Sequence, residues 1–259
     1  MWRARAADVQ QIRLLKAARD RFSLHPLSIH VNYLVNLASA DPVIRAKSIE
    51  CFRGELERAA AIGAEYLVLH PGSSRGRAAE EAIDSLAVAL GEAAHGFRAP
   101  GLTVLLENTA GAGFHLGSRF EELHEIRQRA GNLTDLALGY CLDTCHLLAA
   151  GFDIASAGGL RRAVESADAC LDLSHVHLIH TNDSQMPLGS RRDRHAGIGE
   201  GHIGINGFRR ILRHPKLHNK AFILETPVQN PHDDRRNLTI LKTLAGRANT
   251  KAHSVISKS

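Results

Sequence analysis

The stretch from Tyr66 to Glu107, YLVLHPGSSRGRAAEEAIDSLAVALGEAAHGFRAPGLTVLLE, contains one complete strand–helix–strand unit. Short runs of β-forming residues at Tyr66–His70 and Leu102–Glu107 enclose a helical pattern over Ala78–His95. Two strands joined in this way run parallel, because the helix must carry the chain back across the sheet. The stretch therefore predicts the repeating unit of an α/β fold.

The same alternation continues on both sides of this unit. Further strands are predicted at Leu27–Tyr33, Leu136–Asp143, His175–Thr181 and Ala221–Thr226. Further helices are predicted at Asp8–Phe22, Val43–Ile62, Ser118–Ala130, Gly158–Leu171, Gly207–Leu212 and Arg235–Ala245. Such repetition predicts a parallel sheet, either a (β/α) barrel or a doubly wound sheet.

Composition limits the class of protein further. The chain has 259 residues, 44% of them hydrophobic, which is enough for one large α/β domain. The net charge of +5 favours acidic partners such as nucleic acid. We expect no membrane association, because no apolar run is long enough to span a bilayer. Four scattered cysteines indicate a reducing cytoplasm, and Cys141 and Cys145 are interpreted as core thiols because their C-x3-C spacing lacks a second pair.

The predicted strands share one property at their carboxyl ends, where both architectures bind ligands. Each run has a histidine or a carboxylate at or within three residues of its carboxyl end. One such residue is usually structural, but six together predict a polar cluster. Imidazoles and carboxylates without thiols suit a divalent metal, with zinc favoured and manganese or iron as alternatives. The six residues are His30, His70, Glu107, Asp143, His180 and Glu225.

Three further candidate ligands lie beyond the strand ends. His146 follows Asp143 by three residues, and a tight turn there would aim it away from Asp143. Asp193 and His195 are two residues apart, so in an extended loop they face the same side, about 6–7 Å apart. Nine ligands exceed the needs of one ion and suit two or three ions that share a bridging carboxylate. Clustered divalent ions in a basic protein indicate phosphoryl hydrolysis.

The motifs around these residues resemble those of the endonuclease IV family, also called apurinic/apyrimidinic endonuclease family 2, in the xylose isomerase-like TIM barrel superfamily. The resemblance extends from about Trp2 to Leu244. The matching motifs are HVNYLVNL from His30, HPGS from His70, ENTAG from Glu107, CLDTCH from Cys141, HTNDS from His180, GSRRDRHAGIGEGHIG from Gly189 and ILETP from Ile223.

The resemblance implies a TIM-type (β/α) barrel with three zinc ions that cleaves double-stranded DNA 5′ to an abasic site and leaves a 3′-hydroxyl. Manganese is an alternative at one position. Glu107 would be the bridging, catalytic carboxylate. By the same resemblance, one zinc is assigned to His30, His70 and Glu107, a second to Glu107, Asp143, His180 and Glu225, and a third to His146, Asp193 and His195.

The resemblance also implies how DNA is bound. Tyr33 and Leu34 match side chains that enter the minor groove. Independently of the resemblance, the basic side chains near the loops are candidate phosphate contacts, among them Arg75, Arg191, Arg192 and Arg194. The glycines of the GIGEG segment from Gly197 would let the backbone approach the phosphate chain. The family precedent is a monomer.

The resemblance has two departures. Six strands are visible where a closed barrel has eight, so residues 1–246 are interpreted as a single (β/α) barrel domain that lacks the first strand–helix–strand, and residues 247–259 as a polar, mobile tail. Such a barrel would expose unpaired strand edges at Leu27–Tyr33 and Ala221–Thr226. The second departure is Phe114 and His115, which stand where the family tends to be small and polar.

Two other functions compete with the nuclease. A single-metal sugar isomerase or epimerase of the same superfamily would use strand-end ligands but would have no use for His146, Asp193 and His195. An inactive, shortened relic would keep the ligands without cleaving damaged DNA. Metal stoichiometry and incision of abasic DNA distinguish the three functions.

Overall fold

The structure of the protein is a computed structural model that describes residues 8–246. Its helices are α1 (Val9–Phe22), α2 (Pro42–Ile62), α3 (Ala79–Ala94), α4 (Phe120–Gly131), α5 (Thr144–Ala150), α6 (Ala157–Leu171), the 3-10 helix η1 (Leu173–His175), α7 (Gly204–Arg213) and α8 (Asp233–Leu244). Its strands are β1 (Ser28–His30), β2 (Tyr66–Leu69), β3 (Thr103–Glu107), β4 (Ala137–Asp143), β5 (Val176–His180), β6 (Asp183–Ser184), β7 (His195–Ala196) and β8 (Ala221–Ile223).

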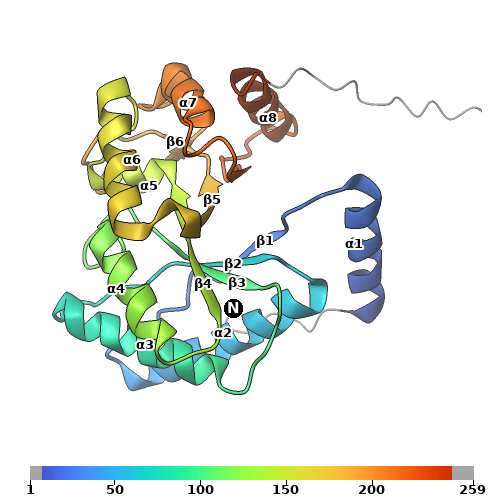
Figure 1. Ribbon diagram of the computed structural model, residues 1–259, viewed down its shortest axis with the longest axis vertical. Coiled ribbons are helices and arrows are strands. Elements are labelled where there is room, and N and C mark those ends of the chain that lie inside the picture. The colour runs from blue at the N-terminus through green and yellow to red at the C-terminus, as the bar shows by residue number, and fades with distance from the viewer. Residues whose placement is uncertain (1–7, 247–259) are drawn as a thin grey trace, which may run out of the picture.

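Six parallel strands form one curved sheet in the order β1-β2-β3-β4-β5-β8. Helices α2, α3, α4 and α6 follow one another along the outer side of this half-barrel (Figure 1). Within residues 8–246, β1 and β8 are the edge strands, as the count of six predicted strands implies. The predicted TIM-type barrel with six visible strands is confirmed.

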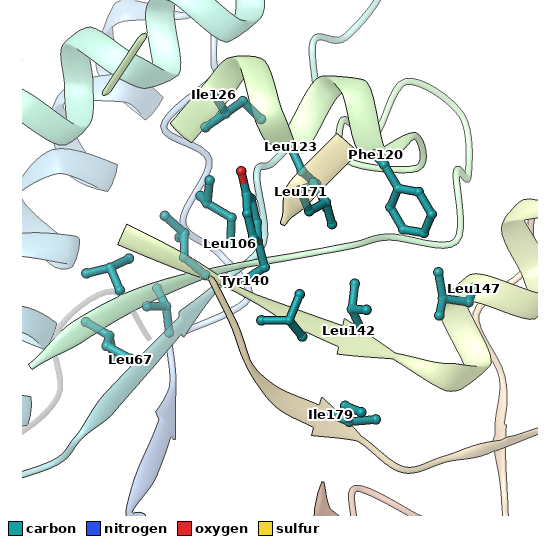
Figure 2. Packing of buried hydrophobic residues seen from close by; sticks show 14 of the residues in the cluster. Leu67, Leu106, Phe120, Leu123, Ile126, Tyr140, Leu142, Leu147, Leu171 and Ile179 are labelled. Atoms are coloured by element: carbon teal, nitrogen blue, oxygen red, sulfur yellow. The ribbon is translucent and has the colours of Figure 1, made fainter. Parts of the chain in front are cut away.

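Alternation along the strands divides the core into two clusters. In β3, Val104 and Leu106 belong to the large cluster between sheet and helices, whereas Leu105 belongs to a smaller cluster inside the curve. Figure 2 shows the large cluster, in which Leu106 and Tyr140 of the sheet lie beneath side chains of α4. Because the outer core fixes the strands, their carboxyl ends are held in fixed relative positions.

The first helix is attached to the sheet by polar contacts. Asp8 caps α1 through the amide of Gln10, and the buried Arg19 guanidinium contacts the Glu65 carboxylate at 2.7 Å. Arg19 contacts both oxygens of this carboxylate, and Oε2 also accepts from the backbone N–H of Leu27, just before β1. These bonds connect α1 to the start of the sheet, although most of the α1 surface is exposed.

The predicted elements agree with the structure except at some boundaries and short segments. The predicted carboxyl ends of β3 and β4 are correct, whereas the other four predicted strands are too long at that end; β2, for example, ends at Leu69 and β8 at Ile223. Helix α5 was missed because Asp143 ends β4 and also caps this helix through the His146 amide. The β6–β7 hairpin was also missed, because each of its strands has two residues.

Two expectations concern other parts of the chain. The predicted tail at 247–259 lies outside the described residues, as do residues 1–7 of the predicted domain. Among the described residues, no helix combines the length and apolar character needed to cross a bilayer.

Candidate metal centre

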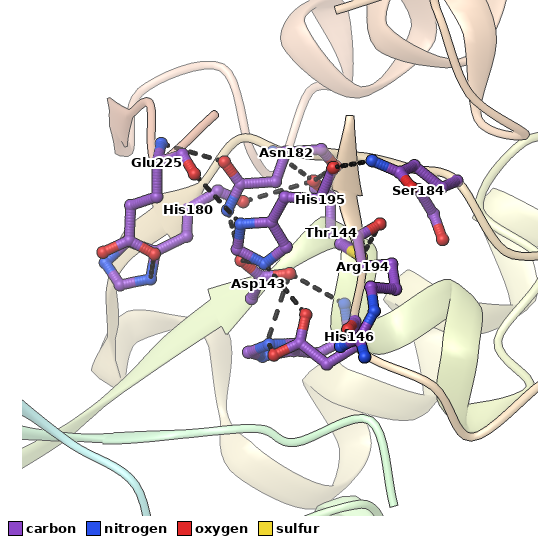
Figure 3. A network of polar contacts seen from close by, with 12 residues as sticks. Asp143, Thr144, His146, His180, Asn182, Ser184, Arg194, His195 and Glu225 are labelled. Carbon is purple, nitrogen blue, oxygen red and sulfur yellow. Dashed lines mark hydrogen bonds and ion pairs between the residues drawn. The ribbon is translucent and has the colours of Figure 1, made fainter. Parts of the chain in front are cut away.

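The structure brings the nine predicted ligands to the carboxyl edge of the sheet. His30, Glu107, Asp143 and His180 are the last residues of their strands. His70 is one residue beyond β2, and Glu225 two residues beyond β8. Of the remaining three, His146 lies in α5, Asp193 in the segment that leads into β7, and His195 is the first residue of β7. Figure 3 shows how several of these side chains converge from different elements.

Glu107 is the centre of the cluster and is fully buried. Its Oε2 lies 3.0 Å from Nε2 of both His30 and His70. Its Oε1 lies 2.8 Å from Nδ1 of His180 and 3.6 Å from Nδ1 of His146. One carboxylate therefore faces two groups of histidines, which is the arrangement that a bridging ligand requires.

Asp143, His180 and Glu225 lie on the other side of Glu107. His180 Nδ1 is 3.0 Å from Glu225 Oε2 as well as close to Glu107. The buried Asn182 amide donates to Asp143 Oδ2 at 2.5 Å and its oxygen accepts from the Glu225 backbone N–H at 2.9 Å. Asn182 thereby links the end of β4, which carries Asp143, to the segment after β8, which carries Glu225.

The third group contains His146, Asp193 and His195. Asp193 extends one carboxylate oxygen to each histidine, 3.1 Å to His146 Nε2 and 3.2 Å to His195 Nε2. The expectation that His146 points away from Asp143 is wrong: its Nδ1 lies 3.8 Å from Asp143 Oδ1, because α5 begins directly after Asp143. Both histidines therefore face Asp143 and Asp193, with His195 Nε2 3.8 Å from Asp143 Oδ2.

Backbone carbonyls orient three of the imidazoles. In each ring Nδ1 donates to a carbonyl oxygen: His30 to Val31 at 2.7 Å, His146 to Asn108 at 2.9 Å, and His195 to Glu225 at 3.0 Å. Each ring then directs Nε2 at the carboxylates, as in histidines that bind metal through that atom. Nε2 of His195 is buried and, within residues 8–246, faces carboxylate oxygens without a well-aligned hydrogen bond, with Asp193 Oδ1 at 3.2 Å.

The charges of the cluster shift its pKa values strongly. Burial lowers the pKa of His146, but the carboxylates of Asp143, Asp193 and Glu107 outweigh burial and raise it to about 10. Burial also lowers the pKa of His195, but Asp193 and Asp143 outweigh burial and raise it to about 9. Burial raises the pKa of Glu107, yet the charges of His180 and His70 hold it well below its ordinary value. Without metal the cluster is therefore a network of charged pairs.

These residues fit divalent metal ions. Ligand atoms converge to within 4.8 Å of one another in groups formed by His30, His70 and Glu107, by Glu107, Asp143, His180 and Glu225, and by Asp143, His146 and His195. Glu107 and Asp143 each belong to two of these groups. Imidazoles with fixed rings, anionic oxygens and the inward-facing Nε2 of His195 are the donors that zinc prefers.

Two cysteines lie near the cluster without carrying the features of ligands. Cys141 and Cys145 are both fully buried, as the interpretation as core thiols requires. Burial raises the pKa of each thiol to about 12, so both are protonated at neutral pH. A protonated thiol is a poor zinc ligand, since the thiolate is the binding form.

Asp183 is a residue that sequence reasoning missed. It is fully buried, and its carboxylate accepts from the backbone N–H groups of Gly199 at 3.0 Å, Gly201 at 3.1 Å and Ile203 at 2.9 Å. A β-carbon at Gly201 would collide with the Ser184 carbonyl oxygen. The glycine-rich segment therefore wraps around Asp183, and the expectation that its glycines let the backbone approach DNA stays a prediction. The Asp in the HTNDS motif was the available signal.

A groove with a volume of about 550 Å³ opens beside the metal cluster. It is lined by His30, His70, His146 and Asp193 and by three loops that follow β1, β2 and β3. Among the predicted DNA contacts, Tyr33, Leu34 and Arg75 line this groove, and the Tyr33 side chain is 89% exposed. Arg194, another predicted contact, is exposed and donates to the Asp193 carbonyl oxygen at 2.7 Å, next to the cluster.

The fold and the cluster together define a class: a (β/α) barrel with a candidate multi-ligand metal centre at the carboxyl ends of its strands. Residues 2–244 match the family model described as xylose isomerase-like TIM barrel. A probable endonuclease 4 of Solibacter usitatus is 67% identical over 246 residues, which are 95% of this chain and 85% of that protein.

Solved structures agree with this assignment. Endonuclease IV from Thermus thermophilus superimposes with a TM-score of 0.82 at 38% identity, covering 96% of this chain and 86% of that chain. A D-tagatose 3-epimerase-like protein shares the fold alone. It superimposes with a TM-score of 0.68 at 24% identity, covering 92% of this chain and 83% of that chain. The chain belongs to the endonuclease IV family, as its motifs predicted.

Proposed function

We propose that this member of the endonuclease IV family hydrolyses the phosphodiester on the 5′ side of an abasic site in double-stranded DNA and leaves a 3′-hydroxyl. Family membership makes the protein a metal-dependent nuclease of DNA repair. The observation that carries the finer proposal is Glu107, whose two carboxylate oxygens face separate groups of histidines within one cluster. Such a bridging position suits adjacent dications, which phosphodiester hydrolysis uses to balance the charge of attacking and leaving oxygens.

We assign three zinc ions to the nine residues, with manganese as an alternative at one position. His30, His70 and Glu107 would hold the first, and Glu107, Asp143, His180 and Glu225 the second. His146, Asp193 and His195 would hold the third, with the Asp143 carboxylate beside both of its histidines. Bound zinc supplies Lewis acidity that makes water nucleophilic near neutral pH and neutralises phosphate charge.

The protein's own groups position the reactants in this proposal. Carbonyl-fixed rings and the Asn182 bridge hold the donors in place before substrate arrives, so little reorganisation accompanies the reaction. The cluster forms one wall of the groove, so the scissile phosphate is presented to it from the side of the three loops.

The groove supplies the proposed contacts to DNA. The exposed ring of Tyr33 and the neighbouring Leu34 would fill the space left by the missing base, and Arg194 would contact a phosphate. Displacing an abasic nucleotide costs less than displacing a paired one, which favours this lesion.

The wider assignment of the protein belongs to the same proposal. We place it in the cytoplasm, where the free thiols of its cysteines stay reduced, and as a monomer on its DNA. We keep residues 1–246 as one barrel domain. Within the described residues 8–246, β1 and β8 are its open edges, and these are the positions where the strands of a closed barrel would pair.

The convergence of His146, Asp193 and His195 separates this proposal from a sugar isomerase. An isomerase with one metal has no use for a second set of histidines beside the first. No observation favours that activity over hydrolysis.

The decisive experiment uses metal-replete protein and a duplex that contains one tetrahydrofuran abasic analogue. We expect a single incision 5′ to the analogue, its loss after chelation and recovery with zinc. A Glu107→Gln variant should bind less metal and lose incision by at least about 100-fold. A well-folded protein that holds several zinc ions but leaves the duplex intact would refute the proposal and support an inactive relic.

A further inference from the structure

Two basic side chains that are not metal ligands line the groove beside the cluster. Arg75 comes from the loop after β2 and His115 from the loop after β3, and both line the groove together with His70, His146 and Asp193. The charges of these three cluster residues all act on the His115 ring, which places the ring near the metal centre.

The backbone holds the two loops against each other. The N–H of Ser74 donates to the Phe114 carbonyl oxygen at 3.0 Å, and the N–H of Leu116 donates to the Gly72 carbonyl oxygen at 2.9 Å. Ser73 and His115 pair as an isolated antiparallel bridge. Arg75 and His115 therefore project from adjoining backbone that is already ordered without substrate.

The loop after β2 is also held by Asn36, a residue outside these two loops. The side chain of Asn36 donates to the Ser73 carbonyl oxygen at 3.1 Å and accepts from the Ser73 N–H at 3.1 Å. Arg75 itself has a φ of +49°, in the left-handed region that a β-carbon disfavours. Its N–H donates to Ser73 Oγ at 3.3 Å, which helps to hold this conformation. Strained residues of this kind cluster at functional sites.

Neither side chain is engaged by the protein itself. Within residues 8–246, the Arg75 guanidinium and the His115 ring form no hydrogen bond or ion pair with another side chain or with a carbonyl oxygen. Arg77, two residues further along the same loop, does have such a partner and donates to the Ala38 carbonyl oxygen at 2.5 Å. The N–H groups of Arg75 and His115 are therefore available to a ligand in the groove.

We propose that Arg75 and His115 form a clamp for one phosphate of the DNA strand, next to the phosphate that lies at the metal centre. The guanidinium supplies charge and paired donors, and the imidazole supplies one N–H. This inference rests on the proposed function, because it takes DNA as the substrate. It goes beyond the ligand set by assigning a substrate contact to His115, which no metal role requires.

The test measures binding of metal-replete protein to the nicked product duplex by fluorescence anisotropy over a range of salt concentrations. Arg75→Ala should weaken binding by about tenfold and lower the slope of log K against log salt by about 0.9, the loss of one phosphate contact. His115→Ala should weaken binding by about five- to tenfold at pH 8 with no change in slope, because a neutral imidazole releases no counterion. The double variant should lose less than the product of the two effects if both contact one phosphate.

Conservative variants separate contact from folding. Arg75→Lys should keep the salt slope, and His115→Gln, which retains an N–H donor, should recover most of the affinity. His95→Ala removes an exposed histidine at the end of α3 and serves as the matched control. Zinc content and melting temperature should stay at wild-type values in all variants, and in steady-state incision KM should rise while kcat changes less than about twofold.

The outcomes are distinguishable from failure of the proposed function. A wild-type protein that neither binds nor cuts abasic DNA removes both proposals. A wild-type protein that cuts, with alanine variants that bind and cut as it does, overturns the clamp alone. A fall in zinc content in His115→Ala would also overturn it, because the residue would then act on the metal centre.

Discussion

The Nδ1 atom of His195 lies 3.0 Å from the backbone carbonyl oxygen of Glu225, thirty residues further along the chain. This hydrogen bond ties the first residue of β7 to the segment that follows β8. It directs the buried Nε2 at Asp193 Oδ1, 3.2 Å away, as the nitrogen that can bind metal once the ring has lost its second proton. The third candidate metal position therefore depends on two strand ends at once.

His195→Ala should remove one metal without unfolding the protein. Elemental analysis is expected to show about one zinc fewer per chain, and incision of abasic DNA should fall by about 100-fold or more. The matched control is His218→Ala, which removes an exposed histidine that contacts only the backbone of its own turn. Unchanged zinc content in His195→Ala would argue against its role as a ligand.

Metal binding should release protons near neutral pH. In the metal-free protein the pKa is about 10 for His146 and about 9 for His195. The pKa of His180 is also raised: burial lowers it, but the charge of Glu107 outweighs burial. All three rings are then protonated near neutral pH and must lose a proton to bind metal, so about three protons should be released per chain. Titration calorimetry in two buffers of different ionisation enthalpy measures this number.

The same pKa shifts set the sign of the pH dependence. Because the histidine pKa values are raised, the charged pairs stabilise the metal-free fold fully below pH ~6.5 and lose that contribution as pH rises through about 9 to 10. Burial raises the pKa of Asp193, but His146 and His195 outweigh burial and lower it. The contribution of Asp193 to the stability of the metal-free fold is therefore lost as pH falls below ~4. Zinc affinity should accordingly increase with pH up to about 9 to 10, and an affinity independent of pH would contradict this.

Asp183→Asn should destabilise the protein by roughly 2–4 kcal/mol, because a neutral amide replaces a buried carboxylate that accepts several backbone N–H groups. Urea unfolding measures the change, with the m-value expected to stay constant. Asp135→Asn is the control, since its side chain is 83% exposed and lies 3.6 Å from Arg98 in a surface pair, with an expected effect within about 0.5 kcal/mol. Equal effects of the two substitutions would show that Asp183 does not organise the loop.

Cys141 and Cys145 should resist alkylation in the native protein. Burial raises both pKa values to about 12, so at mildly alkaline pH little thiolate forms and no surface is open to reagent. Iodoacetamide should modify the partly exposed Cys170 first, as peptide mass spectrometry would show. All four cysteines should react in guanidinium chloride. Rapid native modification of Cys145 would mean that the segment around α5 opens.

The strand–helix alternation made most of the fold predictable. Runs such as Tyr66–His70 are apolar on both faces, and only a parallel sheet covered by helices buries such runs. The boundaries were less well predicted, because β1 ends at His30 and not at Tyr33. A strand ends where the neighbouring strand no longer offers hydrogen-bond partners, and that neighbouring strand lies far away in the sequence.

The candidate site was predictable as a set of residues but not as a geometry. Parallel strands place their carboxyl ends together, so six strand-end ligands follow from the sequence. The position of His146 does not follow, because it depends on Asp143 acting as a helix cap. The role of Asp183 was also hidden, since its partners are backbone amides of Gly199 and Gly201, which carry no side-chain signal.

The sequence by itself determined the class of fold, the identities of the nine candidate ligands and the family, because each is written in local patterns and in residue types. The tertiary structure decided which carboxylate faces two groups of histidines, which nitrogen of each ring is directed inward and which basic side chains remain without a partner beside the groove. These features depend on distances between atoms from different strands, and the packing of helices against the curved sheet sets those distances.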